Sequence, residues 1–338
     1  MILSKANCYF MRKLLFVFIS FSVFSQEKVQ FLDAENRQPV AYAAIALGEG
    51  FGGYTDFEGY FTFQEKQTFT VSMLGYKTLN VTQGDFKEVI FLEAESLLLD
   101  EVTITKKSGK RKVSKQKPYW KNATWLDAFT PQIGNEIAVL IPNEKKQEMT
   151  LSKISIPIAT NPFRIFDKES RKNLNSHEEL PYAIVRIRFY SNENNKPYDV
   201  LYSDEIIANI HNFNNKFSEI DLESYNIDIP ENGLFVGIEF IGFADKNQKY
   251  VYFPNYRLIE RHGKKIKSPY PLGTCIPIDV KKNKSQQTFI RYSDWDKGGE
   301  KLQWLPFTEE KFLKLNSEIE KRKGSANIGL GYELKVYE

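Results

Sequence analysis

The chain has 338 residues, of which 42% are hydrophobic and 14% aromatic, and its formal charge is +3. This length is sufficient for two domains, each with a hydrophobic core of its own. The basic residues concentrate in one short segment instead of spreading over a folded face, which argues against a nucleic-acid-binding protein. Aromatic residues suit pleated, half-buried surfaces, so the composition favours an all-β fold.

Residues 1–25 are predicted to be a secretory signal peptide. Two basic residues precede an apolar run, 14–24, which is too short to span a bilayer. Small residues occupy the −3 and −1 positions of a cleavage site after Ser25, so the mature chain would begin at Gln26 with a formal charge of zero. An uncleaved anchor is the alternative, and Met11 is an alternative start of the precursor.

The cysteines predict a fold without disulfides. Cys8 precedes the apolar run and is therefore not a lipoprotein cysteine, which leaves Cys275 in the predicted mature chain. A single cysteine forms neither an internal disulfide nor a cysteine metal cluster. The fold must then be held together by its hydrophobic cores.

Residues 26–105 are predicted to form a small β-sandwich, because short β-forming runs alternate with turn formers about every 8–12 residues. Within it, the segment 52–63, GGYTDFEGYFTF, places Asp56 and Glu58 two residues apart, as at the start of a calcium loop. Calcium needs about 6–8 oxygen ligands, which this segment does not supply. We favour a turn, because aspartate bonds to its own backbone two residues on and Gly59 can adopt a positive φ.

The segment 106–120 is predicted to be a linker. Residues 106–117 include seven basic residues and no acidic one, and they show no apolar periodicity. Two alternatives are open for this segment: a solvated spacer, which we favour, and a contact with anionic lipid headgroups.

Residues 121–338 are predicted to form a larger, jelly-roll-like β-sandwich. Their strand-like runs alternate apolar and polar residues, the pattern of antiparallel sheets with one buried and one solvated face. In this pattern Arg186, Arg188 and Glu239 are expected to face solvent. One helix is predicted at 309–323, where acidic residues begin the segment and basic residues end it.

Four segments of the first unit resemble a known family. They are NRQPVAYAAIAL, GGYTDFEGYFTF, VSMLGYKTLNV and SLLLDEVTIT. In order and spacing they are similar to the carboxypeptidase regulatory-like domain, a small transthyretin-like β-sandwich that is common in exported and outer-membrane proteins of the Bacteroidetes type. The resemblance covers about 80 of the 338 residues and implies a location more than an activity.

The end of the first unit, residues 99–102 (LDEV), also resembles the segment that leads into TonB-dependent transporters. Such transporters continue into a plug and a 22-stranded barrel. The 218 residues after the predicted linker are too few for either. An accessory partner of outer-membrane transport is therefore one alternative for the function.

The family name suggests a peptidase, which the residues do not support. A zinc carboxypeptidase needs a His-x-x-Glu pair and a third ligand, and no glutamate follows His177, His211 or His262 at that spacing. A Gly-x-Ser-x-Gly nucleophile motif and a phosphate-binding loop are also missing from the sequence. We therefore expect no catalytic residue, no metal and no cofactor. A hydrolase that uses two carboxylates on envelope polymers is the alternative.

The predicted ligand-binding residues lie close together near the C-terminal end. They are Tyr292, Trp295 and Trp304, with Asp294 and Asp296 among them. In the loops of a sandwich, aromatic faces can stack on sugar rings. The favoured alternative is that both tryptophans are core anchors or edge covers, since tryptophan is usually buried. The Asp-x-Asp spacing leaves calcium or a plain turn as alternatives for the two aspartates.

Together these features predict a non-catalytic binding or assembly module, exported to the periplasm, the outer membrane or the cell surface. The expected partner is an envelope glycan or an outer-membrane protein, bound through loops of the second sandwich. Nucleic acid is not expected as a partner, and contact with the membrane depends on the basic linker.

Overall fold

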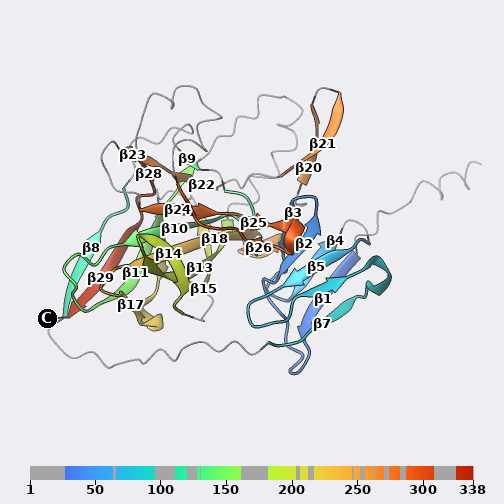
Figure 1. Cartoon of the computed structure of the whole chain (residues 1–338), viewed down its shortest axis with the longest axis horizontal. Coiled ribbons are helices and arrows are strands. Elements are labelled where there is room, and N and C mark those ends of the chain that lie inside the picture. The colour runs from blue at the N-terminus through green and yellow to red at the C-terminus, as the bar shows by residue number, and fades with distance from the viewer. Residues whose placement is uncertain are drawn as a thin grey trace, which may run out of the picture.

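The structure is a computed structural model in which the chain is all-β, as the composition predicts (Figure 1). The predicted signal peptide and the helix predicted at 309–323 lie outside the described residues. In the described part of the chain, no helix is long and apolar enough to cross a membrane. The structure describes residues 27–63, 66–95, 111–119, 128–129, 131–160, 182–202, 206–211, 217–245, 247–251, 256–261, 263–269, 274–281, 287–307 and 325–337.

The first sandwich consists of two sheets with a phenylalanine-rich core between them. Alternation along the strands places Phe31, Phe61, Phe63 and Phe69 in this core, where the Phe63 and Phe69 ring centroids lie 4.7 Å apart. One sheet has the order β4 (Tyr60–Phe63), β1 (Glu27–Asp33), β7 (Val89–Leu92), and the other β3 (Phe51–Tyr54), β2 (Ala44–Gly48), β5 (Phe69–Ser72), β6 (Leu79–Val81), with the 3-10 turn η1 (Gln83–Asp85) after β6.

The turn predicted in GGYTDFEGYFTF is confirmed. Oδ1 of Asp56 accepts hydrogen bonds from the backbone N–H groups of Glu58 at 2.9 Å and Tyr60 at 2.8 Å. Gly59 has φ +74°, a conformation that side-chain-bearing residues rarely adopt. Asp56 therefore orders the chain between β3 and β4.

The second sandwich also has two sheets. Both consist of antiparallel pairs, as the alternating pattern predicts. The large sheet has the order β14 (Lys196–Val200), β13 (Tyr182–Glu193), β18 (Leu234–Ala244), β10 (Glu136–Ile141), β24 (Thr288–Arg291), β27 (Leu305–Pro306), with β15 (Ile206–His211) beside β13 and β19 (Tyr250–Val251) beside β18. The facing sheet has the order β16 (Phe217–Asp221), β11 (Met149–Pro157), β29 (Gly331–Tyr337), β8 (Arg111–Gln116), with β17 (Ile227–Asp228) beside β11 and the 3-10 turn η3 (Glu223–Tyr225) between β16 and β17.

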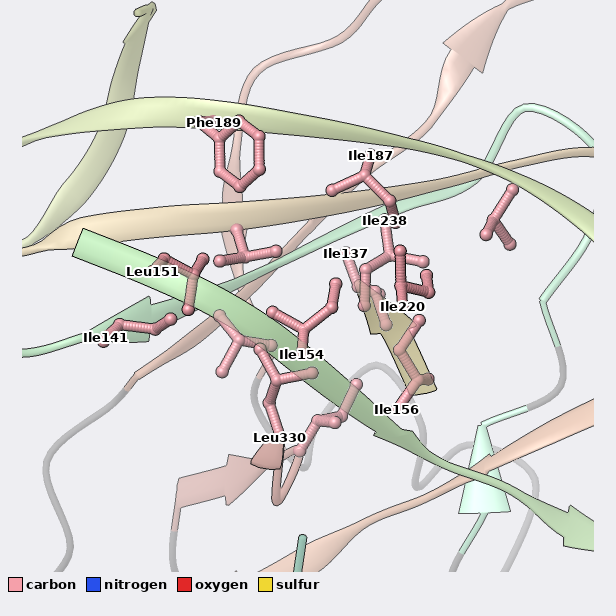
Figure 2. Packing of buried hydrophobic residues seen from close by; sticks show 14 of the residues in the cluster. Ile137, Ile141, Leu151, Ile154, Ile156, Ile187, Phe189, Ile220, Ile238 and Leu330 are labelled. Carbon is pink, nitrogen blue, oxygen red and sulfur yellow. The ribbon is translucent and has the colours of Figure 1, made fainter. Parts of the chain in front are cut away.

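A separate hydrophobic core fills the space between these two sheets. Ile187 and Ile238 come from the large sheet and Ile154 and Ile156 from the facing one, and all are fully buried (Figure 2). The many isoleucines fit because β-branched side chains pack well on a pleated surface. The two-layer arrangement confirms the predicted β-sandwich.

The segment 106–120, which is predicted to be a linker, includes regular structure at residues 111–116. These residues form β8, which pairs with the C-terminal strand β29 from Arg111 opposite Tyr337 to Gln116 opposite Tyr332. All six residues of β8 are exposed, as the basic composition suggests. Charged residues on an edge strand hinder pairing with another chain, so the basic segment protects this sheet edge.

Shorter sheets extend the second sandwich. The 3-10 turn η4 (Trp295–Lys297) and its flanking strands lie between the two sandwiches (Figure 1). These sheets pair β12 (Ala159–Thr160) with β22 (Thr274–Pro277) and β22 with β9 (Ala128–Phe129), β23 (Asp279–Lys281) with β28 (Ser325–Asn327), β20 (Tyr256–Arg261) with β21 (Lys264–Pro269), and β25 (Ser293–Asp294) with β26 (Glu300–Lys301).

Replacement of Ile238 by alanine should lower the free energy of unfolding by about 2–5 kcal/mol, because it leaves a cavity in the middle of the second core. Urea denaturation measures the loss. Val200→Ala, on the edge strand β14 where the side chain is 37% exposed, is the control and should cost much less. Equal losses in the two variants would contradict this description of the core.

Candidate functional site

The two sandwiches meet at a buried interface, which we call the seam. It joins β2 and β3 of the first sandwich to β18 and the η4 turn of the second. An apolar cluster crosses it, so the seam contains a small core of its own. The fully or nearly buried members of that cluster are Ala46, Tyr54, Ile184, Ile241, Ala244 and Trp295.

Trp295 anchors the seam. Its side chain is 7% exposed and packs edge-to-face on Tyr54, with ring centroids 5.7 Å apart. A methyl group on Gly52 would lie 2.0 Å from its Cε3 atom, and one on Gly134 would lie 2.7 Å from its Cζ2 atom. The indole therefore fits only because glycines from both sandwiches leave space for it.

Hydrogen bonds also cross the seam around this anchor. Oδ1 of Asp296 accepts from the backbone N–H of Gly50 at 2.8 Å. The hydroxyl of Ser72 donates to the carbonyl of Gly298 at 3.0 Å. One backbone N–H and one side-chain hydroxyl of the first sandwich thus find partners at the η4 turn of the second.

The centre of the seam is a charged group that we call the Glu239 cluster, formed by Glu239, Lys301, Arg186, Arg188 and Tyr54. Glu239 is 1% exposed. Its carboxylate lies 2.6 Å from Nζ of Lys301, 2.8 Å from Nη1 of Arg188 and 3.1 Å from Nη1 of Arg186. The hydroxyl of Tyr54, from the first sandwich, donates to the same carboxylate at 2.5 Å.

The prediction that Arg186, Arg188 and Glu239 face solvent is wrong. They do point away from the core between the two sheets, but the first sandwich covers that face of the large sheet. Arg186 also donates from Nη2 to the carbonyl of Tyr42 at 2.8 Å, across the seam. Alternation along a strand shows which residues share a face, but it does not show what packs against that face.

Lys301 uses all three of its N–H donors inside the seam. Besides Glu239, its Nζ donates to the carbonyl of Gly134 and the hydroxyl of Ser293, both at 2.9 Å. Burial lowers the pKa of Lys301, although Glu239 opposes the shift. Burial alone would raise the pKa of Glu239, but Lys301 and the two arginines hold it well below its usual range. Burial and the nearby carboxylate raise the pKa of Tyr54 well above that of free tyrosine.

A second carboxylate extends the charged network along the same face of the sheet. Glu136 is fully buried and accepts two hydrogen bonds from Arg291, at 2.7 and 2.8 Å, and one from the Tyr190 hydroxyl at 2.6 Å. The guanidinium of Arg291 lies 4.2 Å from the centre of the Trp304 ring. Both N–H groups of Arg291 donate to the same oxygen, Oε2, while Oε1 accepts from Tyr190, and charge-assisted bonds of this kind are stronger than neutral ones.

The structure does not bring the predicted ligand-binding residues to one place. Trp295 is buried in the seam, which agrees with the favoured alternative that it is a core anchor and not a ligand-binding residue. Trp304 packs on Arg291 and Tyr190, and Tyr292 packs against the core of the second sandwich. Asp294 caps η4, and Asp296 bonds to the first sandwich. All five side chains thus have structural partners within the protein.

A cleft opens beside the seam, which we call the seam cleft. It consists of two adjoining hollows of about 260 and 190 Å³ that share Phe57 and Tyr250. The first hollow is also lined by Tyr42, Asn209 and Gln248. The second is also lined by Lys28, Asp56, Glu58 and Tyr60. One wall therefore comes from each sandwich.

The walls of the seam cleft are held by close packing. The Tyr250 hydroxyl donates to the carbonyl of Tyr54 at 3.1 Å, and its ring lies so near Gly242 that a methyl group there would be 2.6 Å from Cε2. Tyr42 has φ +56°, an uncommon value for a bulky residue. Backbone outliers of this kind gather at functional sites, where the surrounding structure maintains them.

A larger hollow of about 490 Å³ lies at the edge of the second sandwich, but its polar lining groups already have partners. Nδ2 of Asn143 donates to the carbonyls of Gln147 and Pro230, and the Tyr202 hydroxyl accepts from the N–H of Asp228 at 2.7 Å. Lys146 and Glu231 at its rim form an exposed ion pair. The seam cleft, whose walls come from both sandwiches, is therefore taken as the candidate site.

The described residues show no arrangement typical of a cofactor or metal centre. No group of three His, Cys, Asp or Glu side chains within the described ranges could hold a metal ion. Glycines 48, 50 and 53 have the Gly-x-Gly-x-x-Gly spacing, but they lie in the β2–β3 hairpin. A dinucleotide-binding turn needs this spacing between a strand and a helix.

The seam cleft could not be predicted from the sequence, because its residues come from six separate segments between Lys28 and Tyr250. The signal that was available is Phe57, an apolar residue among the polar residues of a predicted turn. Turns are usually built from glycine, proline, asparagine, aspartate and serine, so an aromatic side chain at a turn tip is unusual. No pattern in the sequence indicates that Gln248 and Tyr250 face it.

The structure defines an all-β protein whose two sandwiches are joined by a buried charged interface. Residues 30–104 match the family model of the CarboxypepD_reg-like domain. The first sandwich is therefore a CarboxypepD_reg-like domain, as the sequence resemblance indicates. Among the curated proteins, none matches this chain.

One solved structure with a weak likeness is that of the cysteine protease and lectin-like domains of Cwp84, a surface layer associated protein of Clostridium difficile. The two chains are 9% identical, with a TM-score of 0.32. The match covers 93% of this chain and 63% of that one. At this level the likeness supports no statement about function.

Gly52→Ala should separate the two sandwiches, because the added methyl group would occupy the position of the Trp295 ring. We expect the tryptophan emission maximum to move to longer wavelength as Trp295 meets water, and the stability of the seam to fall by about 1–3 kcal/mol. Gly84→Ala is the matched control, since its methyl group would lie 3.9 Å from the nearest atom, Oγ1 of Thr82. Identical spectra for the two variants would show that Trp295 does not anchor the seam.

Glu239→Gln should reduce the free energy of unfolding at neutral pH by about 3–5 kcal/mol, because it leaves buried cations without their carboxylate. The pKa of Glu239 is lowered on folding, so its contribution is complete above the ordinary glutamate pKa of about 4.3 and is lost as the pH falls through the folded-state value. The wild type should therefore lose stability in acid more steeply than the variant.

Denaturation curves recorded over a range of pH measure this difference. Glu93→Gln, which removes the partner of an exposed lysine, is the control and should change neither the stability nor its pH dependence appreciably. A Glu239→Gln variant with wild-type stability at neutral pH would contradict the role assigned to this carboxylate.

Proposed function

We propose that the protein is a non-catalytic binding module of the cell envelope and that it binds its partner in the seam cleft. The observation that carries this proposal is the composition of the cleft, in which each sandwich supplies one wall. A ligand in the cleft contacts both domains, and the buried Glu239 cluster keeps the two walls in a fixed relation. The small domain then serves as half of the binding surface.

The hydrogen bonds of the two buried carboxylates, Glu136 and Glu239, support a role of the protein in binding over one in catalysis. A general acid or base must be free to exchange a proton with a substrate. Glu136 and Glu239 instead accept hydrogen bonds from arginine, lysine and tyrosine inside the protein. Glu239 is paired inside the seam and Glu136 with residues of the second sandwich, and neither side chain lines the cleft.

The proposed location in the cell envelope is supported by two observations. One is the predicted signal peptide, and the other is that domains like the first one are common in exported and outer-membrane proteins. Both favour export to the periplasm, the outer membrane or the cell surface. The expected partner is an envelope glycan or an outer-membrane protein.

The proposal is tested in cells that express the full chain and with isolated envelopes. The mature protein should be recovered outside the cytoplasm with Gln26 at its N-terminus, and the purified protein should sediment with envelope material. Phe57→Ala should reduce this sedimentation by about tenfold, because Phe57 is 54% exposed in the cleft and supplies much of its apolar contact.

Phe91→Ala is the matched control, because Phe91 is a 44% exposed phenylalanine of the same domain that lies outside the cleft. It should leave sedimentation unchanged. Retention of the protein in the cytoplasm, or equal sedimentation of the two variants, would refute the proposal.

A further inference from the structure

We propose that the ligand of the seam cleft is a neutral polysaccharide, held as a chain of at least two sugar units. This inference rests on the proposed function and names the class of partner. It depends on the aromatic surfaces, the free polar groups, the charge balance and the shape of the cleft.

Two aromatic side chains are placed for contact with a sugar ring. Phe57 is more than half exposed, and Tyr250 forms part of the lining of both hollows. The apolar C–H face of a pyranose stacks on such rings, whereas most charged ligands do not require them. Tyr60 has a different role, because Nζ of Lys28 lies 3.8 Å from its ring centre.

Polar groups suited to hydroxyls surround these rings. Nδ2 of Asn209 donates to Oε1 of Gln248 at 3.2 Å. Among the described residues, the structure shows no partner for Oδ1 of Asn209 or Nε2 of Gln248, so one acceptor and one donor remain. Glu58 is exposed beside Phe57 and adds a carboxylate that accepts hydrogen bonds from hydroxyls. A sugar hydroxyl, which both donates and accepts, matches this mixture.

The charges of the cleft favour a neutral ligand over a polyanion. The second hollow is lined by two lysines, Lys28 and Lys249, and by two carboxylates, Asp56 and Glu58. Their formal charges balance, so the cleft has no excess of positive charge to attract uronic acid, phosphate or sulfate groups. Binding should therefore depend little on salt concentration.

The division of the cleft into two hollows indicates that the ligand is a linear polymer. Each hollow, at about 260 and 190 Å³, is smaller than the roughly 300–1,000 Å³ of an ordinary small-molecule pocket. Because they adjoin at Phe57 and Tyr250, one linear molecule with a repeating unit can occupy both. A single sugar unit would use only part of the contact surface.

Native gel electrophoresis through soluble polysaccharides tests this inference with the full mature chain. The neutral probes are starch, dextran, xyloglucan, mixed-linkage β-glucan and mannan, and the anionic ones are alginate and polygalacturonate. At least one neutral probe should retard the protein, with the same effect at low and high salt. Phe57→Ala should weaken the retardation about tenfold, while Phe57→Trp and Phe91→Ala should keep it. Hexasaccharides of the active polymer should compete better than its monosaccharide.

Several outcomes would overturn the inference. One is the absence of retardation by every neutral polysaccharide, and another is equal retardation of the wild type and Phe57→Ala. A third is Phe57-dependent sedimentation with envelopes that survives digestion of their polysaccharides but is lost after protease treatment. That result would identify a protein partner and would leave the proposed function intact, whereas failure to sediment with envelopes at all would count against the proposed function itself.

Discussion

The carboxylate of Glu239 connects the two halves of the molecule. A buried carboxylate without partners would cost several kcal/mol, and here β13 supplies two arginines and β26 a lysine as its partners. The remaining partner, the hydroxyl of Tyr54, comes from the other sandwich. Docking of the first sandwich removes water from this group, and the same docking supplies one of the donors that make its burial tolerable. The charged cluster and the seam therefore form together.

The remaining features of the seam follow from this arrangement. A charged face of the large sheet cannot pack against an apolar surface, so the first sandwich presents Tyr54 and the carbonyl of Tyr42 to it. Beside the charges, Trp295 fills the space that the glycines leave and supplies the apolar contact that ion pairs lack. Both contacts constrain the position of β3, and the turn that follows β3 carries Phe57. The position of the proposed binding surface is thus a consequence of how the charged face is covered.

The sequence predicts what depends on local order and misses what depends on contact between distant segments. The turn at Asp56 could be predicted because its partners lie within four residues, and the inward residues of β13 and β18 could be predicted because alternation is a property of one strand. The burial of Glu239 could not, since it depends on a domain more than a hundred residues away. The strand at residues 111–116 could not be predicted for a related reason. An edge strand needs only backbone hydrogen bonds to β29, and such bonds leave no apolar pattern in the sequence.

The relation between the seam and the cleft has a thermodynamic consequence. A ligand that touches Phe57 on one wall and Gln248 on the other binds only the docked arrangement, so its apparent affinity falls in proportion to the docked fraction. Two loosely docked domains would bind more weakly for this reason. The entropic cost of ordering the two walls on binding would weaken the affinity further. We expect the Glu239 cluster to favour the docked arrangement, so that the cleft is formed before a ligand binds. In the proposed function, the buried charges therefore affect the affinity through the docked fraction, although they do not line the cleft.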